Sequence, residues 1–249
     1  MDKKTLYREA LQEYLRRTGK ESFRVKAALI DMDGVLYDTM PLHSKAWYKL
    51  FSSLGVKCTP EEFYLYEGMT GHATINMVFQ REFSKTLSEE ECAELYQKKV
   101  DYFHEQGEGT LMSGADRMLR TLVDRGLKRV LVTGSGQKSI LDKVDEDYPG
   151  VFTQCEKVTS NNVTKGKPAP EPYLLGMKFA DVKPEESIVI ENAPLGVRAG
   201  VAAGAFTIAV TTGPIPREEM LRCGANIVFD DMEQFASELG ALLDVLGTK

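Results

Sequence analysis

The stretch Ala27-Ala-Leu-Ile-Asp31-Met-Asp33-Gly34 constrains the fold of this chain more than any other part of its sequence. An apolar run ends there in two acids two positions apart and then a glycine, which predicts a buried parallel strand that leads into a loop at the carboxyl edge of a sheet. Because side chains alternate along a strand, both carboxylates point to the same side and can face one reacting group. Asp-Gly is also common in surface turns, but a turn does not require an acid at the buried end of an apolar strand, where an unpaired carboxylate is costly. The stretch therefore predicts a functional site at a sheet edge.

The length and charge of the chain narrow the classes of function. Its 249 residues can form one large α/β domain, or a domain with an insertion. The formal net charge of -6 argues against a nucleic-acid partner, so a small anionic substrate would need a local positive pocket or a metal ion. No apolar run approaches the ~18 residues of a membrane span, and no apolar stretch follows the charged start, so we expect a cytoplasmic protein without a membrane partner. The sequence leaves the oligomeric state open and favours a monomer.

Residues 1–24 are expected to form a helical extension ahead of the core. Leu6, Leu11 and Leu15 recur at helical spacing among charged residues up to about Arg24, and Gly19 follows the last turn. We expect this helix to lie on the surface of the core or to form an oligomer contact.

Residues 39–110 are expected to form an all-helical insertion. Thr59-Pro60-Glu61-Glu62 and Ser88-Glu-Glu-Glu91 are strong helix starts, and no strand pattern interrupts the segment. The segments with helical apolar spacing are 43–54, 59–67, 74–83 and 88–105. So many helical residues between two strands indicate a separate domain inserted into the core.

Residues 25–38 and 111–249 are expected to form the core. In its second part short apolar strands alternate with helices, which is typical of a doubly wound, mostly parallel sheet. The expected strands are 129–133, a weaker one near 157–159, 187–191, 206–210 and 225–229, and the expected helices are 115–125, 137–146, 171–180, 196–203 and 232–246. The predicted fold class is therefore α/β, a doubly wound sheet with an inserted all-helical domain.

Two later segments offer groups that can bind an anion. One strand ends in Thr133, and the small residues Gly134 and Ser135 leave backbone N–H groups free to meet an anion. Lys167 precedes Pro168, so it lies in an extended loop and can reach inward, although a lone lysine in such a loop more often lies in solvent. Each signal is modest alone, but their order along the chain makes them consistent with one site.

A third segment adds oxygen donors to the acid pair. Glu191 and Asn192 stand at the end of the predicted strand 187–191. Carboxylate and amide oxygens at adjoining strand ends form a hard-oxygen site suited to Mg²⁺, which keeps several waters and accepts a substrate phosphate as a further ligand. Together with Lys167 and Thr133, such a site favours a phosphoryl group.

With these segments together, the chain resembles the haloacid dehalogenase superfamily. The resemblance covers the chain after Arg24 in the right order, and the helical insertion is similar to the small cap of the β-phosphoglucomutase-like phosphatases. The matching motifs are Asp31-Met-Asp33-Gly34-Val, Thr133, Lys167-Pro168 and Glu191-Asn192-Ala-Pro-Leu-Gly196.

The resemblance implies a phosphoaspartyl mechanism with Mg²⁺ as cofactor. Asp31 would attack phosphorus in line, while Mg²⁺ and Lys167 keep it ionised and draw charge from the phosphoryl oxygens. Asp33 would protonate the leaving oxygen, then deprotonate the attacking water, and would also lend a backbone carbonyl to the metal. The phosphoryl oxygens would be held by Thr133, Gly134 and Ser135, and the implied metal site comprises Asp31, Asp33, Asn192 and, in an outer position, Glu191.

The chain departs from the family pattern at three positions. Many relatives carry an aspartate where Asn192 stands, so this chain lacks one negative charge in the ligand set, and Glu67 is a candidate to replace it. The mutases carry a basic residue where Glu67 stands, and an arginine that holds a second phosphate where Gly71 stands. Both differences argue against a sugar bisphosphate intermediate. Glu67 could bind metal or substrate, or it could be an exposed cap carboxylate.

Two further cap residues resemble substrate-binding positions of the family. His43 would lie near the leaving group, unless it only packs at a hinge beside Trp47. Lys99 resembles a cap lysine that reaches the substrate, with a solvated helix face as the alternative. Ser135 and Gln137 would line the entrance, whereas His72 and His104 are expected to be bystanders.

Three functions follow from these residues. The first is a Mg²⁺-dependent phosphohydrolase for a small phosphorylated substrate, with inorganic pyrophosphate as the first candidate because the cap, with Glu67 and without the arginine, resembles the pyrophosphatase-like branch. The second is β-phosphoglucomutase, which converts β-glucose 1-phosphate into glucose 6-phosphate. The third is a non-catalytic protein with the same fold, which the presence of both Asp31 and Asp33 disfavours.

Overall fold

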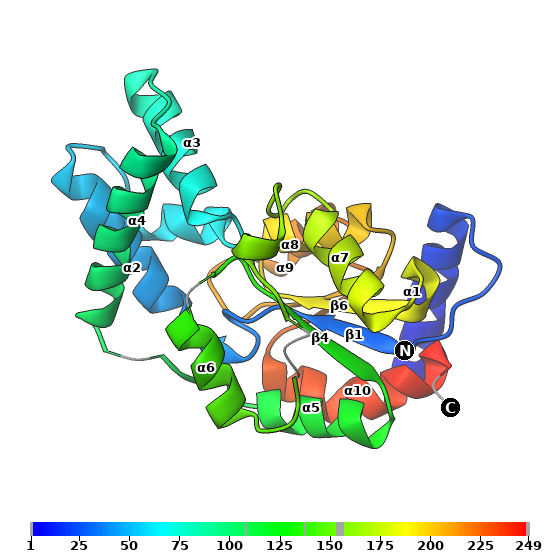
Figure 1. Ribbon diagram of the computed structural model, residues 1–249. Helices are drawn as coiled ribbons and strands as arrows, with labels where there is room; N and C mark the ends of the chain where they lie inside the picture. The colour runs from blue at the N-terminus through cyan, green and yellow to red at the C-terminus, as the bar shows by residue number, and fades with distance from the viewer. Residues whose placement is uncertain (1, 108, 137, 153–156, 248–249) are drawn as a thin grey trace.

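A six-stranded parallel sheet forms the centre of the molecule (Figure 1). The computed structural model describes residues 2–107, 109–136, 138–152 and 157–247. The strand order is β5 (Lys157–Val158), β4 (Lys128–Val132), β1 (Ala27–Ile30), β6 (Ser187–Glu191), β7 (Phe206–Val210) and β8 (Ile227–Phe229). β1 lies between β4 and β6, and Ile30 at its end is paired with Leu131 and Ile190. The carboxyl ends of these three strands therefore meet at one edge of the sheet.

Helices cover both faces of this sheet, which confirms the predicted doubly wound fold (Figure 1). One face is covered by α1 (Lys3–Thr18), α5 (Ala115–Asp124), α6 (Lys138–Asp147) and α10 (Met232–Leu246), and the other by α7 (Glu171–Ala180) and α8 (Pro194–Ala202). Along β1, Ala28 and Ile30 pack on the first face, whereas Ala27 and Leu29 pack on the second. Because both faces are buried, the strands are continuous apolar runs instead of alternating ones.

Three short helices were not predicted. They are α9 (Arg217–Arg222) and the 3₁₀ helices η3 (Ser160–Asn162) and η4 (Pro184–Glu186). None of them is long enough to show a helical period in the sequence. Each lies in a connection between elements of the predicted core.

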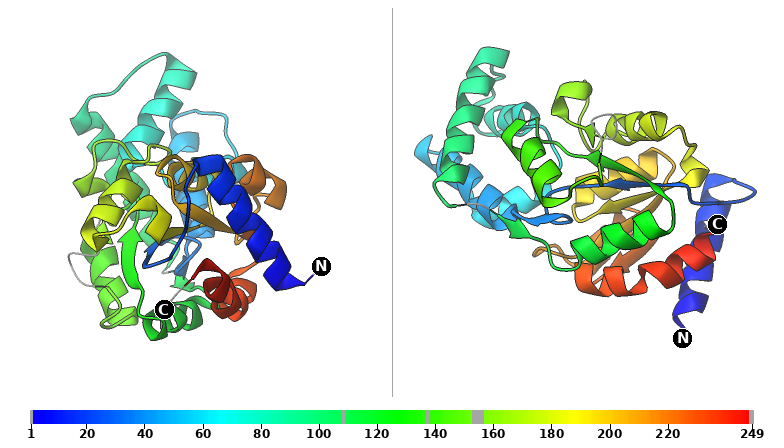
Figure 2. Two further views of the ribbon diagram at one scale, coloured as in Figure 1. Left: turned by 90° about the vertical axis from the view of Figure 1, so that its right-hand side faces the viewer. Right: turned by 60° about the horizontal axis from the view of Figure 1, so that its bottom comes forward.

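The N-terminal extension packs on the core, and its helix ends just before Gly19, as that glycine predicted. α1 ends at Thr18, because Gly19 takes a left-handed conformation (φ 67°) that closes the helix; residues 19–24 are not helical. Tyr7 donates a hydrogen bond to Glu238 of α10, and Tyr14 donates one to the Gly204 carbonyl (2.8 Å). Figure 2 shows α1, in blue, beside the red α10 at the end of the sheet.

The inserted helical domain, called the cap below, lies between two short strands. β2 (Tyr37–Asp38) and β3 (Thr110–Leu111) pair antiparallel, and this ribbon was not predicted. The cap contains α2 (Met40–Ser53), the 3₁₀ helix η1 (Pro60–Tyr66), α3 (Gly71–Phe83) and α4 (Glu89–His104). Ser88 starts α4 with the predicted capping box, whereas the segment after Thr59 is a 3₁₀ helix. We propose residues 39–110 as the extent of the cap.

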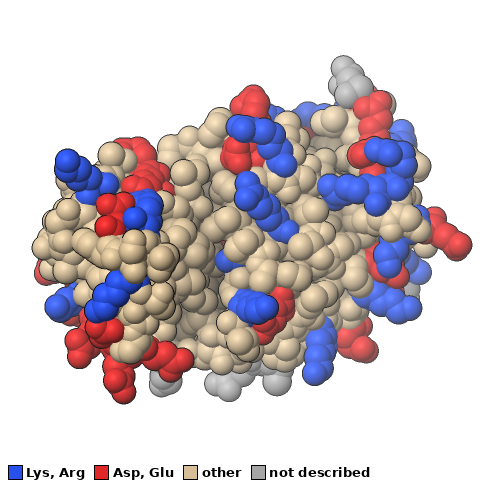
Figure 3. Space-filling model, turned by 90° about the horizontal axis from the view of Figure 1, so that it is seen from above, with Lys and Arg blue, Asp and Glu red and all other residues tan. Residues whose placement is uncertain are grey.

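The outer surface carries charges of both signs. On the face seen in Figure 3, Lys and Arg side chains lie next to Asp and Glu side chains. Within the part of the chain that the structure describes, none of the helices has the length and apolar character that crossing a bilayer requires.

Candidate active site

Four segments meet at the carboxyl edge of β1, β4 and β6. Asp31 follows β1, Glu191 ends β6, and Lys167 comes from the loop before α7. Lys167 Nζ lies 2.5 Å from Asp31 Oδ1 and 2.5 Å from Glu191 Oε1, and it also donates to the Val132 carbonyl at the end of β4 (3.2 Å). All three charged side chains are buried. The structure thus brings Asp31 into contact with Lys167, which lies 136 positions further along the chain.

Burial and mutual charge shift the pKa values in this cluster. Burial first, and the Glu191 carboxylate second, raise the pKa of Asp31 to about 8, although Lys167 opposes the shift. Burial alone would lower the pKa of Lys167, but Asp31 and Glu191 outweigh it and raise that pKa above its ordinary value. Two carboxylates share one ammonium group here, so a further cation beside Asp31 would favour its ionised form.

Glu191 holds Lys167 and the loop that follows β6. Its Oε1 also accepts from the Tyr173 hydroxyl (2.6 Å), and its Oε2 accepts from the backbone N–H groups of Asn192 (3.0 Å) and Ala193 (3.2 Å). Both oxygens are engaged within the protein, which agrees with an outer position at most, and membership of Glu191 in a metal site stays a prediction. Tyr173 was not predicted, because the sequence shows only a tyrosine on the apolar face of a helix.

A chain of hydrogen bonds connects Asp33 to the cap. Asp33 Oδ1 accepts from Thr39 Oγ1 (2.5 Å) and lies 3.2 Å from His43 Nε2, and His43 Nδ1 lies 2.5 Å from Lys99 Nζ. The His43 ring stacks on Phe103 with 4.4 Å between ring centres. Lys99 is only 3 % exposed, so the alternative of a solvated lysine is wrong. Thr39 was not predicted, since it lies at a helix start where a threonine is ordinary.

The same chain shows coupled pKa shifts. Burial would raise the pKa of Asp33, but His43, Thr39 and Lys99 outweigh it and hold that pKa below its usual value. Burial and the neighbouring Lys99 lower the pKa of His43. Burial also lowers the pKa of Lys99 to about 8. At neutral pH the arrangement therefore favours an ionised Asp33 and a neutral His43.

The cap contributes a buried carboxylate to the core site. Asn192 Nδ2 donates to Glu67 Oε1 (2.9 Å), so the alternative of an exposed Glu67 is wrong. Burial and the nearby Asp31 raise the pKa of Glu67 well above its ordinary value. An aspartate in place of Asn192 would place two carboxylates side by side. The amide of Asn192 can donate to Glu67 instead, so it is compatible with an acidic residue at this position of the cap.

The oxygen donors in this site fit a hard divalent cation. Asn192 Oδ1 is buried and has no hydrogen-bond partner. An unsatisfied buried oxygen requires an explanation, and a Mg²⁺ ion is one that also suits the donors nearby. Across the described ranges, no three His, Cys, Asp or Glu side chains by themselves form a metal-holding group. The candidate set is instead mixed: carboxylates of Asp31 and Glu67, the amide oxygen of Asn192 and the predicted backbone carbonyl of Asp33.

The predicted anion-binding loop lies at the end of β4. The Thr133 side chain is buried, and its Oγ1 accepts from the Ser135 N–H (3.0 Å), while the Thr133 N–H is bound to the Val158 carbonyl (2.9 Å). Gly134 lines the cavity. The phosphate-binding roles of these residues stay predictions. Gln137 lies outside the described residues.

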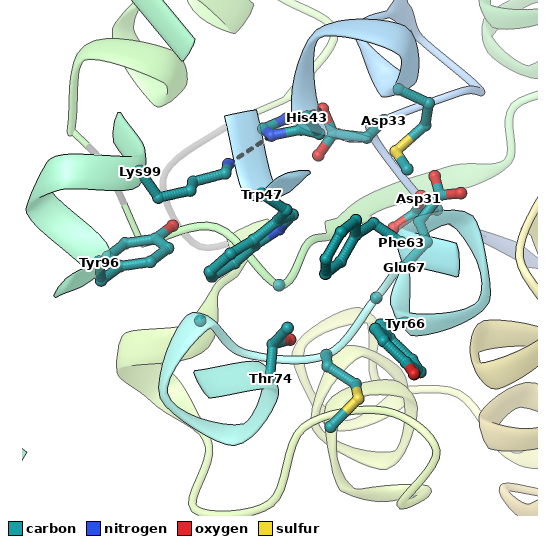
Figure 4. A pocket seen from close by; sticks show the side chains of 15 residues that line it. Asp31, Asp33, His43, Trp47, Phe63, Tyr66, Glu67, Thr74, Tyr96 and Lys99 are labelled. Atoms are coloured by element: carbon teal, nitrogen blue, oxygen red, sulfur yellow. Dashed lines mark hydrogen bonds and ion pairs between the residues drawn. The ribbon is translucent and has the colours of Figure 1, made fainter. Parts of the chain in front are cut away.

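A small cavity of about 70 Å³ lies between the cap and this edge of the sheet. Figure 4 shows Asp31, Asp33 and the bonded pair His43 and Lys99 around it, together with aromatic rings of the cap. The aromatic residues that line it are Trp47, Phe63, Tyr66 and Tyr96. His72 and His104 are not among the residues that line it, and their role as bystanders stays a prediction.

This geometry defines a class of protein: an α/β enzyme with a pair of acids at the sheet edge and a helical cap above them, suited to phosphoryl transfer. Residues 25–204 match the model of the haloacid dehalogenase-like hydrolases, and the chain belongs to that family. It is an enzyme of the phosphatase and phosphomutase group that resembles β-phosphoglucomutase.

Three similar proteins illustrate this group. Hexitol phosphatase A of Escherichia coli is 32 % identical over 212 residues, which cover 85 % of this chain and 93 % of that protein. PpaX of Clostridium perfringens, described as a candidate pyrophosphatase, is 28 % identical over 79 % of this chain and 88 % of its own length. The structure of a candidate β-phosphoglucomutase from Bacteroides vulgatus is 44 % identical and superposes with a TM-score of 0.93, covering 97 % of this chain and 98 % of that one.

Proposed function

We propose that the protein is a Mg²⁺-dependent phosphohydrolase that acts through an aspartyl phosphate, with inorganic pyrophosphate as its first candidate substrate. The observation that carries the proposal is the position of Glu67, a cap carboxylate buried against Asn192 in the wall of a small cavity. A carboxylate at this position can serve as a further metal ligand. It would not attract the second phosphate group of a sugar bisphosphate. The enzyme class rests on the family, and the substrate is our inference.

The residues of the site can carry out the two steps. Asp31 attacks phosphorus, and Lys167, 2.5 Å from it, neutralises charge on the phosphoryl oxygens. Mg²⁺ held by Asp31, Asp33, Asn192 and Glu67 would supply a further positive charge beside these oxygens. Asp33 is ionised in the resting site, so it must first take up a proton; it then gives this proton to the leaving oxygen and takes one from the water that opens the aspartyl phosphate.

His43 and Lys99 lie on the cap side of Asp33, where the leaving group would be. Lys99 places a buried positive charge there, and inorganic phosphate, the leaving group from pyrophosphate, is an anion that such a charge stabilises. The pair also holds Asp33 in place through His43 Nε2.

The cavity favours a compact substrate. A Cβ built on Gly71 would lie 2.2 Å from the Tyr96 ring, so the ring fills the space that a side chain at this position would need. A cavity of about 70 Å³ is also well below the roughly 300 Å³ typical of sites for larger ligands. Pyrophosphate therefore suits the closed site better than a hexose phosphate.

A substrate panel tests this proposal. Phosphate release with Mg²⁺ should show kcat/KM for pyrophosphate at least about tenfold above that for β-glucose 1-phosphate or a hexitol phosphate, a difference of roughly 1.4 kcal/mol in transition-state binding. Asp31→Asn should abolish release of phosphate from every member of the panel. Unchanged release by this variant would contradict the aspartyl-phosphate route.

The second candidate is β-phosphoglucomutase, which the 44 % identity to the Bacteroides vulgatus protein favours. It predicts conversion of β-glucose 1-phosphate into glucose 6-phosphate, primed by a sugar bisphosphate. A coupled assay for glucose 6-phosphate separates the two candidates, and conversion faster than pyrophosphate hydrolysis would replace our first choice.

The metal proposal has a test that needs no turnover. Mg²⁺ should raise the melting temperature of the wild type by mass action. Glu67→Gln keeps the size of the side chain and an oxygen that can accept from Asn192, but it removes the charge, so the rise should be smaller. Glu61→Gln, an exposed cap carboxylate, is the matched control and should respond as the wild type does. An equal rise in all three proteins would remove Glu67 from the metal site.

A further inference from the structure

Two loops that carry site residues lie in direct contact across the gap between cap and core. We call residues 67–70, which include Glu67, the cap loop, and residues 164–168, which include Lys167, the lysine loop. A Cβ built on Gly166 would lie 2.9 Å from Thr70 Cγ2, and one built on Gly68 would lie 2.9 Å from Lys167 Cδ. Side chains do not pack this closely. Each loop therefore approaches the other at a glycine, which has only a hydrogen atom in place of a side chain.

Both loops are restrained by their own hydrogen bonds. Thr70 is the N-cap of α3, with Oγ1 accepting from the Ala73 N–H (3.3 Å), so its methyl group cannot rotate away without loss of the cap. On the core side, the Glu171 carboxylate accepts from the N–H groups of Thr164 (2.7 Å) and Lys165 (2.9 Å). A methyl group between the loops would therefore have to push two fixed backbones apart.

The contact determines where Glu67 lies. Glu67 is three residues from Thr70, and its bond to Asn192 depends on how deeply the cap loop sits on the core. Gly134 makes a third close approach, since a Cβ there would lie 3.1 Å from the carbonyl oxygens of both Gly68 and Met69. The cap loop thus approaches core backbone at both Gly134 and Gly166.

We propose that Gly166 is a positioning residue for the reaction, because its missing side chain lets the cap loop sit on the lysine loop and so places Glu67 beside Asn192 in the closed site. The kinetic part of this inference rests on the proposed function, whereas the structural part does not.

A double-mutant cycle between the two loops tests the proposal. Gly166→Ala should lower kcat/KM by roughly tenfold or more, since small displacements of site groups are costly in rate. Thr70→Ser removes the opposing methyl group but keeps the capping oxygen, so alone it should stay within about twofold of the wild type. Added to Gly166→Ala, it should restore most of the loss, which is the coupling expected of two groups in contact. A loss that Thr70→Ser does not restore would overturn the proposal.

Trp47 provides a readout that requires no substrate. It is the only tryptophan of the chain and lines the cavity between cap and core. Gly166→Ala should make Trp47 more accessible to the quencher acrylamide. In the double variant, the quenching of Trp47 fluorescence should return to the wild-type value. Equal quenching in Gly166→Ala and the wild type would contradict the proposed seating of the cap.

Gly213→Ala is the matched control. Gly213 also faces the cap, but a Cβ there would lie 3.4 Å from the Tyr64 ring, an ordinary contact. This variant should keep both the kinetics and the quenching of the wild type, and a change as large as that of Gly166→Ala would show a general sensitivity of the interface and overturn the proposal. If pyrophosphate is not hydrolysed, the cycle is measured with whichever member of the panel is hydrolysed, so the two failures are distinguishable.

Discussion

Lys99 is a positive charge enclosed by aromatic rings of the cap. Its Nζ lies 5.3 Å from the ring centres of both Trp47 and Phe103 and 2.5 Å from His43 Nδ1. Burial of a charge costs free energy unless it is well paired, and here it lowers the pKa of Lys99 to about 8. A costly group beside the proposed leaving-group site is what a catalytic role would require.

Lys99→Met should lower the activity of the enzyme without lowering its stability. Methionine fits the apolar surroundings but has no charge, so kcat/KM should fall by roughly tenfold to a hundredfold, the usual effect of losing a positioned polar group. The free energy of unfolding at pH 7, measured in urea, should stay the same or rise by about 1–3 kcal/mol, because the cost of burying the ammonium group disappears. A variant that is both active and less stable would give Lys99 a purely structural role.

The same substitution predicts the sign of a pH effect. The pKa of Lys99 falls from an ordinary 10.5 to about 8 on folding, so between these values the unfolded chain binds more protons than the folded one. Stability should therefore rise with pH across this window in the wild type, relative to Lys99→Met. The difference between two urea titration series, at pH 7 and pH 10, measures it.

For single residues, the sequence predicts which of them belong to the site better than it predicts their hydrogen-bond partners. Asp31, Asp33, Lys167 and Asn192 could be named because each stands next to a strand end, a proline or a second acid. Tyr173 and Thr39 carry no such mark, since their hydrogen bonds to Glu191 and Asp33 join residues whose distance in space the sequence does not give.

Among the elements, α1 lies outside the part of the chain that matches the family model, which starts at residue 25. The helix is attached through Glu238 of α10, which accepts hydrogen bonds from Lys3 (2.7 Å) and Tyr7. Burial would raise the pKa of Glu238, but these two donors outweigh it and hold the pKa below its usual value. The extension is therefore an integrated part of the fold.

Tyr7→Phe should destabilise the protein without changing its catalysis. The substitution leaves the ring in place and removes one hydrogen bond to a charged acceptor, which should lower the free energy of unfolding by about 1–3 kcal/mol. Urea unfolding measures this loss, and phosphate release should match the wild type. Glu13→Gln, which breaks an exposed ion pair on the same helix, should have little effect on stability and serves as the control.

Element types could be predicted where the local signals agree. The capping box at Ser88 and the apolar period after it correctly predicted α4. After Thr59 the signals were equally strong, yet the seven residues from Pro60 to Tyr66 form a 3₁₀ helix, because the chain turns there to bring Phe63 into the cap core and Glu67 to the site. Tertiary contacts of this kind override a local pattern.

On the scale of the whole molecule, the cap has a hydrophobic core of its own. The buried residues of this core are Phe51, Val56, Phe63, Ile75, Val78, Leu87 and Cys92. The sheet has separate clusters on its two faces. Two cores joined by a short ribbon predict that the cap can lose structure while the sheet keeps it.

Ile75→Ala tests this independence. The side chain is fully buried in the cap, so its truncation should cost about 2–5 kcal/mol of local stability. In native-state hydrogen exchange, amides of α3 and α4 should lose protection, whereas those of β1 and β6 should not. An equal loss in the sheet would show that cap and core unfold as one unit.

The sequence predicts that a helical domain is inserted, but not how it meets the core. The bond between Asn192 and Glu67 joins residues 125 positions apart, and the close approach of Gly166 to the Thr70 methyl group depends on how the cap meets the core. Neither leaves a local pattern in the chain. The closed arrangement, and with it the size of the cavity, comes from the structure.

The ribbon of β2 and β3 is a place where the inserted domain of such enzymes could be exchanged during evolution. The chain leaves the sheet through Tyr37 and Asp38 and returns through Thr110 and Leu111, and these residues are paired with each other. An insertion whose two ends are paired can be exchanged for another of different length without strain on the strand that precedes Asp31. A different insertion at this ribbon would change what the enzyme accepts, together with the cap side chains Glu67, His43 and Lys99 that reach the site.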